Sequence, residues 1–229
     1  MPRSSEPRRG PGRPPGGTGE ETRYALLEAA RALFSARGYD GVPVRHLAQA
    51  AGVNAAMVHY HFGSKAGLYR EMLQLAATEV LDRVQAALSH PGTDVNERIE
   101  SLFRAVMGVM ARRPWLPRLI VRDVLAPDGR FRDEFLQRFA RPGAGGLLVP
   151  WLREAVARGE LRGDLDAGFA AVSVMSLAVY PFIALPVARE AAEIDMDQST
   201  LERLVVHNTR LFCQGALPRP GSRDQQHDA

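Results

Sequence analysis

Cysteine is nearly absent from this sequence: among its 229 residues there is one, Cys213. A single thiol excludes an internal disulfide and any metal site built from several thiolates, and it fits a reducing cytoplasm. Long apolar runs are missing too. No stretch approaches the roughly 18 unbroken apolar residues of a membrane-spanning helix, and the first residues lack the apolar core of a signal peptide. The sequence therefore predicts a cytoplasmic protein with no membrane partner.

The motifs of several enzyme classes are also absent. There is no phosphate-binding glycine loop, no G-x-S-x-G elbow and no H-E-x-x-H zinc motif. His59 and His61 form the one candidate metal pair, but residues two apart on a helix point about 200° away from each other. No third ligand is evident. We therefore expect no catalytic residue, no metal and no cofactor, and an enzyme is only a remote alternative.

Lysine is the third scarcity, because Lys65 is the one lysine among 29 basic residues. A GC-rich genome accounts for the preference for arginine. The net charge of +3 is small, but it is unevenly distributed. Residues 1–65 hold nine Lys and Arg against five Asp and Glu, and the other 164 residues hold 20 against 21. The excess positive charge therefore lies in the first quarter of the chain, where contact with a polyanion would need it.

The most informative stretch is residues 44–68. Residues 44–51 carry apolar side chains at the i, i+3, i+4, i+7 spacing of an amphipathic helix. Gly52 suits the left-handed position that ends a helix, and Asn54 suits the N-cap of the next one. Two short helices joined by a glycine turn are typical of the helix-turn-helix, whose second helix reads the DNA major groove.

The second of these helices, residues 54–62, is expected to turn Val58 and Phe62 inward with Val53. Its opposite face begins with small residues, continues with aromatic and polar ones, and lacks the Glu and Lys of a solvated helix. Such a face suits insertion against a partner, although two ordinary packed helices in a helical core are the alternative. The predicted outward residues are Ala55, Ala56, Met57, His59, Tyr60 and His61.

The rest of the chain also follows helical patterns, and no alternating apolar run is long enough for a sheet. Thr18 and Glu21 fit a capping box that starts the first helix, and Gly38 ends it. Pro43 suits the first position of the second helix. A long helix is expected from residue 64 or 65 to about Leu88.

In the second part of the chain, helices are expected to begin at Asp94, at Asp166 and at Asp197 or Ser199. Trp115 to Leu125 is expected to be a short apolar segment, followed by a helix over 131–139 and another over 147–158 that Gly159 caps. The most apolar helix, over 167–188, contains Pro181 and Pro186, which should kink or end it. The predicted fold class is all-α, with an N-terminal three-helix helix-turn-helix domain and a larger helical domain.

Residues 1–19 are rich in Pro, Gly and Arg and cannot form a folded core. Residues 12–14 match the centre of an AT-hook, a minor-groove arm. Arg8, Arg9 and Arg13 could then enter an A·T-rich minor groove, where the negative potential is strongest. A solvated, disordered leader is the alternative.

Three ordered runs of residues carry a family resemblance. They are Ala29-Ala30-x-x-Leu33-Phe34 with Gly38-Tyr39, then Val44-Arg45-x-Leu47-Ala48-x-x-Ala51-Gly52-Val53, and Val58-His59-Tyr60-His61-Phe62-x-Ser64-Lys65-x-x-Leu68. Through them, residues 20–68 resemble the DNA-binding domain of the TetR (TetR/AcrR) family of bacterial transcriptional regulators. In the C-terminal part, residues 118–125 resemble CecR-like members of that family.

This resemblance implies a basic arm over 1–19, a DNA-binding domain over 20–66, an effector-binding and dimerisation domain over 67–215, and a disordered tail over 216–229. It also implies a ligand-responsive repressor that binds a palindromic operator in double-stranded DNA and associates with the nucleoid when bound. An activator or an architectural DNA-binding protein is the alternative. The implied DNA-contacting residues are Arg45, Asn54, Ala55, Ala56, Met57, His59, Tyr60, His61 and Lys65.

Three positions depart from the family pattern. Asn54 replaces the usual Ser, Pro43 replaces a Thr that often touches phosphate, and His59 replaces the more usual Tyr. Because histidine titrates near neutral pH, pH-dependent DNA binding is a hypothesis. Lys65 falls on the family's phosphate-contacting lysine, at a helix N-terminus where an anion is favoured.

The implied effector pocket lies among the middle helices, and its lining favours a small apolar or aromatic effector. Packing in the core is the alternative for most of the candidates. Arg122 interrupts an apolar run, so it could pair with an acidic ligand or form an ion pair with Asp123 or Glu154. The candidate residues are Phe103, Met107, Met110, Trp115, Arg122, Trp151, Met175 and Tyr180.

A homodimer is the expected assembly. The 167–188 helix is apolar on more than one face, which a small domain cannot easily cover by itself. Packing this helix and the 199–214 helix against a second copy would form a four-helix interface, as the resemblance also implies.

Overall fold

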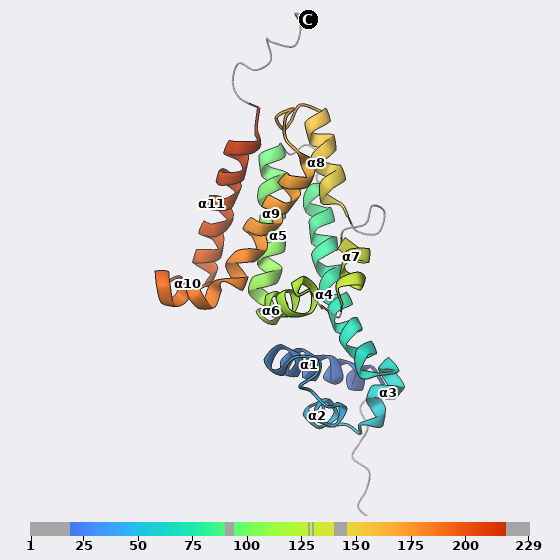
Figure 1. The fold of residues 1–229 in the computed structure, drawn as a ribbon. Coiled ribbons are helices and arrows are strands. Elements are labelled where there is room, and N and C mark those ends of the chain that lie inside the picture. The colour runs from blue at the N-terminus through green and yellow to red at the C-terminus, as the bar shows by residue number, and fades with distance from the viewer. Residues whose placement is uncertain (1–18, 90–93, 128, 130, 140–145, 219–229) are drawn as a thin grey trace, which may run out of the picture. The chain divides into compact units, whose positions relative to one another are not determined.

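The computed structural model describes residues 19–89, 94–127, 129, 131–139 and 146–218. Within these ranges every regular element is a helix (Figure 1), which confirms the predicted all-α fold class. The elements are α1 (Gly19–Arg37), α2 (Val44–Ala50), α3 (Ala56–Phe62), α4 (Lys65–Leu88), α5 (Val95–Arg112), α6 (Trp115–Leu119), η1 (Ile120–Leu125), α7 (Arg132–Phe139), α8 (Leu148–Ala157), α9 (Ala167–Ile183), α10 (Leu185–Ala192) and α11 (Gln198–Ala216).

The chain forms two compact units, which divide between Met72 and Leu73. Helix α4 begins in the first unit and continues into the second. The division falls later than the boundary after residue 66 that the sequence analysis placed. The reason is that the first two turns of α4 belong to the core of the first unit, where Tyr69 is fully buried against aromatic rings.

The core of the first unit is centred on three aromatic rings. Phe34 of α1 stacks on Tyr39 with ring centroids 5.7 Å apart. Tyr69 of α4 meets both rings edge-on, at 5.0 and 5.2 Å. Edge-to-face packing is the preferred arrangement of aromatic pairs. The three rings therefore hold α1, the α1–α2 connection and the start of α4 together.

Local signals in the first unit behave as the sequence predicts. Gly38 and Gly52 adopt the left-handed conformation, with φ of 77° and 67°. Asn54 Oδ1 accepts a hydrogen bond from the Ala56 N–H at 2.9 Å at the start of α3, although the N-cap residue of that helix is Ala55 and not Asn54. Pro43 lies one position before α2 and is its N-cap residue, a difference within the usual uncertainty of helix ends. Thr18 of the proposed capping box lies outside the described residues.

In the second unit α5 packs against both α9 and α11, and α8 packs against α9 (Figure 1). The predicted N-caps are confirmed for three helices. Asp94, Asp166 and Asp197 each accept a backbone N–H three residues on, at 2.8, 2.9 and 2.7 Å. Ser199, the alternative start of the last helix, lies inside α11. Gly159, with φ of 71°, follows α8 as predicted.

The predicted short segment over 115–125 is two elements, the helix α6 and the π-helical turn η1. Arg122 holds the buried Asp123 through two hydrogen bonds of 3.0 Å. Arg132 of α7 donates to the carbonyls of Val124 and Leu125 at 3.1 and 2.9 Å. These bonds satisfy carbonyl groups that the end of the π-helical turn leaves without helical partners.

Pro181 does not end α9, contrary to one of the two predicted outcomes. The helix continues to Ile183, and the chain bends by 69° between α9 and α10. Pro186 lies in the first turn of α10, where proline is well tolerated. Proline has no N–H, so Pro181 leaves the Leu177 carbonyl without its helical donor. The buried side chain of Asn208 on α11 supplies that donor, with Nδ2 2.8 Å from the Leu177 oxygen.

Among the described residues no single helix has the length and apolar character needed to cross a membrane. The bent pair α9 and α10 meets those two criteria when its helices are taken together.

Candidate nucleic-acid interface

Helix α3 presents one exposed stripe to its surroundings. Val58 is fully buried, as predicted. Ala55, Ala56, His59 and Tyr60 are exposed, and Tyr60 has 78% of its surface accessible. Ala55 and His59 are four residues apart, as are Ala56 and Tyr60, so these side chains form two adjacent rows on one side of the helix. The stripe therefore begins with small residues and continues with two rings that carry polar atoms.

The exposed face of α3 contains fewer residues than the sequence analysis predicted. Met57 and His61 are only half exposed. The His61 ring lies beside Gly19 of α1 and edge-on to Tyr60, with ring centroids 4.9 Å apart. Its Nε2 is buried and has no hydrogen-bond partner among the described residues. Helical periodicity alone did not show that α1 covers this side of α3.

His59 is held in one orientation by the end of its own helix. Its Nδ1 lies 3.1 Å from the carbonyl oxygen of Gly63. A carbonyl only accepts, so Nδ1 carries the hydrogen. The exposed Nε2 is then an acceptor in the neutral ring and a donor in the protonated one. The sequence had no signal for this hydrogen bond beyond the four-residue spacing.

Lys65 is a structural residue of the first unit. Its Nζ donates to the carbonyls of Tyr39 and Val42 at 2.9 and 3.1 Å. The ammonium also lies 4.1 Å from the centre of the Tyr39 ring, a cation–π contact. An ammonium has three N–H groups, so one remains for a phosphate. The structure therefore gives Lys65 a structural role that the sequence analysis did not predict, and its contact with phosphate stays a prediction.

Arg45 of α2 is the other basic residue predicted to contact DNA. It is exposed and forms no ion pair with any described residue. Arg23 and Arg31 of α1 differ, because they pair with Glu71 and Glu28. Among these arginines, Arg45 has its charge available for a phosphate.

The part of the first unit that the structure describes is close to neutral. Residues 19–72 contain six Lys and Arg against five Asp and Glu, whereas residues 1–18 contain four Arg against one Glu. Most of the N-terminal excess of positive charge therefore belongs to the predicted arm, including Arg8, Arg9 and Arg13. These residues lie outside the described part of the chain.

In the second unit, the predicted pocket residues occupy three kinds of position. Those on α5 are packed in the hydrophobic core, and Trp115 is partly buried against it. Arg122 is bound to Asp123, the alternative raised from the sequence. Met175 and Tyr180 on α9 are 39% and 64% exposed. The three core residues on α5 are Phe103, Met107 and Met110.

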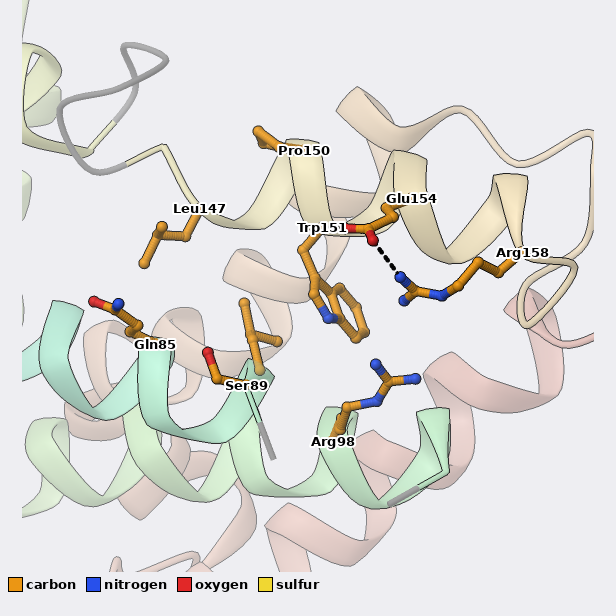
Figure 2. A pocket seen from close by; sticks show the side chains of 9 residues that line it. Gln85, Ser89, Arg98, Leu147, Pro150, Trp151, Glu154 and Arg158 are labelled. Atoms are coloured by element: carbon orange, nitrogen blue, oxygen red, sulfur yellow. Dashed lines mark hydrogen bonds and ion pairs between the residues drawn. The ribbon is translucent and has the colours of Figure 1, made fainter. Parts of the chain in front are cut away.

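Trp151 is the predicted pocket residue that lines a cavity of about 390 Å³ (Figure 2). The other walls come from residues that the sequence analysis did not select. They are Gln85, Leu88, Ser89, Arg98, Leu147, Pro150, Glu154 and Arg158. No periodic signal marks them, because they come from the end of α4, the start of α5 and one side of α8.

Two further features of the second unit bear on function. Exposed apolar residues lie along α9, where Phe169 is 78% exposed, Val172 is 65% exposed and Tyr180 is 64% exposed. We call these residues, with Val206 and Leu211 on α11, the α9–α11 face.

Burial raises the pKa of the Cys213 thiol to about 11, so the thiol is protonated at neutral pH and is a poor nucleophile.

The sequence is similar to those of known bacterial regulatory proteins. Residues 26–72 match the model of "Bacterial regulatory proteins, tetR family". The transcriptional repressor NicS of Pseudomonas putida is 24% identical over 185 residues, which cover 77% of this chain and 87% of NicS. The nucleoid occlusion factor SlmA of Vibrio vulnificus is 30% identical over 121 residues, covering 52% of this chain and 61% of SlmA.

The fold is shared with solved structures at low sequence identity. The fatty acid degradation regulator FadR of Bacillus halodurans superposes with a TM-score of 0.68 at 19% identity. The superposition covers 85% of this chain and 95% of FadR.

Proposed function

Because this chain belongs to the tetR family of bacterial regulatory proteins, it is a DNA-binding transcriptional regulator, and we propose that it acts as a ligand-responsive repressor. In this proposal it binds a palindromic operator as a homodimer in the bacterial cytoplasm, and a small apolar or aromatic effector releases it. The observation that carries the proposal is the exposed stripe of α3 behind a glycine turn, where Ala55, Ala56, His59 and Tyr60 face outward.

The chemistry of the stripe suits a base-reading surface. The two alanines permit close approach and apolar contact with a thymine methyl group. His59 Nε2, when neutral, can accept from the exocyclic amine of adenine or cytosine, and the Tyr60 hydroxyl can donate or accept. Sequence preference then falls mainly on these two side chains. Asn54, Met57 and His61 lie at the margins of the stripe.

Positioning on the duplex would come from positive charge outside the stripe. We assign phosphate contacts to Arg45 and to the remaining N–H of Lys65. The arginines of the N-terminal arm would add affinity in the adjacent minor groove, because residues 19–72 are nearly neutral.

A homodimer would present two recognition helices to two half-sites roughly 34 Å apart. The α9–α11 face supports this assembly, because several large apolar residues are exposed on two helices that contact each other, and exposed apolar surface of this kind marks interaction sites. Packing α9 and α11 against the same helices of a second copy would form a four-helix, two-fold interface.

An effector bound in the second unit would act by binding more tightly to the form that does not fit DNA. The two half-sites must be contacted at the same time, so a small change in the spacing of the recognition helices is enough to release the operator.

The test is footprinting of the DNA that flanks the gene for this protein. A protected palindrome is expected there, and a screen of small molecules should find one that releases it. The variants H59A and Y60A should each lose roughly 1–3 kcal/mol of operator binding and little non-specific binding. R45A, as the matched control, should weaken binding to all sequences alike. Equal losses on specific and non-specific DNA for Y60A would contradict base reading by α3.

A second candidate is DNA binding without transcriptional control, which the similarity to SlmA, named a nucleoid occlusion factor, favours. A reporter promoter that carries the protected palindrome distinguishes the two. Repression that requires Tyr60 supports the proposed function, and an unaffected promoter supports the second candidate.

A further inference from the structure

The cavity beside Trp151 lies entirely within the second unit (Figure 2). Its volume of about 390 Å³ is at the lower end of the range for small-molecule sites. Gln85 and Leu88 of α4 and Ser89, which directly follows it, form one wall, and Leu147 and Pro150 form part of the opposite wall. The site therefore fits a small molecule with a substantial apolar surface.

One donor in this cavity has no acceptor. Trp151 is 9% exposed, and its Nε1 is buried without a hydrogen-bond partner among the described residues. Figure 2 shows this nitrogen on the edge of the ring that faces the end of α4, where Ser89 lies. Buried N–H groups in native proteins nearly always have an acceptor. A ligand with an acceptor against this edge of the ring could satisfy the donor.

The charges at the other side of Trp151 are already paired. Arg98 donates to Glu160 at 2.5 Å, and its guanidinium lies 5.4 Å from the Trp151 ring. Arg158 donates to Glu160 at 3.0 Å and to Glu154 at 2.5 Å. Hydrogen bonds from Arg158 and Arg98 hold the pKa of Glu160 below its usual value, so this carboxylate remains ionised. Two arginines and two glutamates balance, and neither guanidinium needs an anion.

We propose that this cavity binds a small, uncharged, mostly apolar molecule with a hydrogen-bond acceptor, such as a carbonyl oxygen, that receives the Trp151 Nε1–H. The proposal deepens the proposed function, on which it rests, because it names the chemical class of the effector. Two wall residues, Gln85 and Leu88, belong to the last turns of α4, the helix that begins with Lys65 in the first unit, and Ser89 directly follows that helix. A ligand here therefore contacts the helix that is common to both units.

The experiment uses the full chain, labelled with nitrogen-15, and follows the indole N–H resonance of Trp151 in solution. The variant W115F removes the other indole and assigns the signal. Acetophenone is the probe, because it is neutral, nearly apolar and carries one carbonyl. We expect a saturable downfield shift as the indole N–H gains an acceptor.

Two matched compounds test the chemistry of recognition. Cumene has the shape of acetophenone without the acceptor, and benzoate keeps the acceptor but adds a negative charge. Each should bind about tenfold more weakly than acetophenone, as the loss of one hydrogen bond or the burial of an unpaired charge requires. Acetophenone that produces no saturable shift, cumene that binds equally well, or benzoate that binds more tightly would each overturn the proposal.

Two variants test the location. W151F keeps an aromatic ring but removes the N–H, so it should abolish the preference for acetophenone over cumene, measured by saturation-transfer experiments on the ligand. S89F should fill the cavity from an exposed position just after α4 and block both compounds. S101F, at an exposed serine on α5 away from the cavity, is the matched control and should bind both normally. Undiminished binding of acetophenone to S89F would place its site elsewhere.

None of these measurements uses DNA, so the two proposals fail separately. A normal acetophenone response in a protein that binds no operator counts against the proposed function alone. Normal operator binding without any acetophenone response counts against this site alone.

Discussion

At the scale of single residues, Lys65 joins two tasks in one side chain. Its ammonium fixes the α1–α2 connection through the carbonyls of Tyr39 and Val42, and it retains one N–H at the start of α4. A basic residue that only bound phosphate could be removed without loss of stability. Lys65 differs, because its removal would leave the Val42 carbonyl without this donor and the Tyr39 carbonyl with the longer bond from the Val42 N–H, at 3.4 Å.

K65A should therefore lower the free energy of unfolding by about 1–3 kcal/mol, the cost of leaving such groups unsatisfied. It should also reduce the salt slope of operator binding by about one. Denaturant titration and binding at several salt concentrations measure the two effects. R37A, which removes an exposed charge at the end of α1, should leave stability within about 0.5 kcal/mol. Unchanged stability of K65A would show that the carbonyl contacts contribute nothing.

At the scale of helices, two backbone contacts determine how neighbouring helices pack against each other. Pro181 withholds a donor from α9, and Asn208 of α11 replaces it. At Gly67 of α4, an added Cβ would lie 1.9 Å from the carbonyl oxygen of Phe62. The first feature joins two helices of the second unit, and the second sets how closely α4 follows α3.

N208A should cost about 1–3 kcal/mol of unfolding free energy, because the Leu177 carbonyl would be buried without a donor. P181A restores the helical N–H, so the double variant N208A/P181A should be less destabilised than N208A alone. Thermal denaturation of the wild-type protein, N208A, P181A and the double variant gives the coupling free energy between the two positions. Strictly additive effects would mean that Asn208 does not replace the donor that Pro181 lacks.

G67A should weaken operator binding at least about tenfold, since the backbone of α3 or α4 must shift to relieve the overlap with Phe62. Gly215 of α11 is the matched control, because an added Cβ there meets no atom within 4 Å. G215A should instead stabilise the protein by roughly 0.5–1 kcal/mol through helix propensity. Operator binding and thermal denaturation measure the pair, and a G67A protein with normal affinity would contradict the argument.

At the scale of the whole molecule, the question is what covers the α9–α11 face. Phe169, Val172 and Tyr180 expose far more apolar surface than the interior side of the same helix, which is packed on α5 and α8. A stable interface buries about 1,600 Å² in total. Two copies of a helix pair with large apolar residues along one side are suited to supply such an area.

F169D should convert a dimer at micromolar concentration into a monomer, since a carboxylate on the two-fold interface would be buried without a partner. Light scattering gives the mass, and operator affinity should fall with it because the two half-sites would no longer be linked. L136D, at an exposed leucine of α7, is the matched control and should remain dimeric. A wild-type protein that is monomeric at these concentrations would contradict the proposed assembly.

The sequence by itself determined the fold class, the family and most helix ends. These features depend on local physics, such as apolar periodicity, the side-chain caps at Asp94, Asp166 and Asp197, and the left-handed glycines at 38 and 52. Each signal acts within about one helical turn, so it can be read without knowledge of the folded chain.

The tertiary structure alone decided which side chains form hydrogen bonds or contacts with elements that are distant in the sequence. The partners of Lys65 lie 23 and 26 residues away, and Asn208 is 31 residues from the carbonyl that it satisfies. The position of His61 beside α1 and the open donor of Trp151 are of the same kind. Such contacts depend on how helices pack, which periodicity constrains only to a face. The sequence therefore predicted the reading helix, and the structure decided which of its side chains face outward.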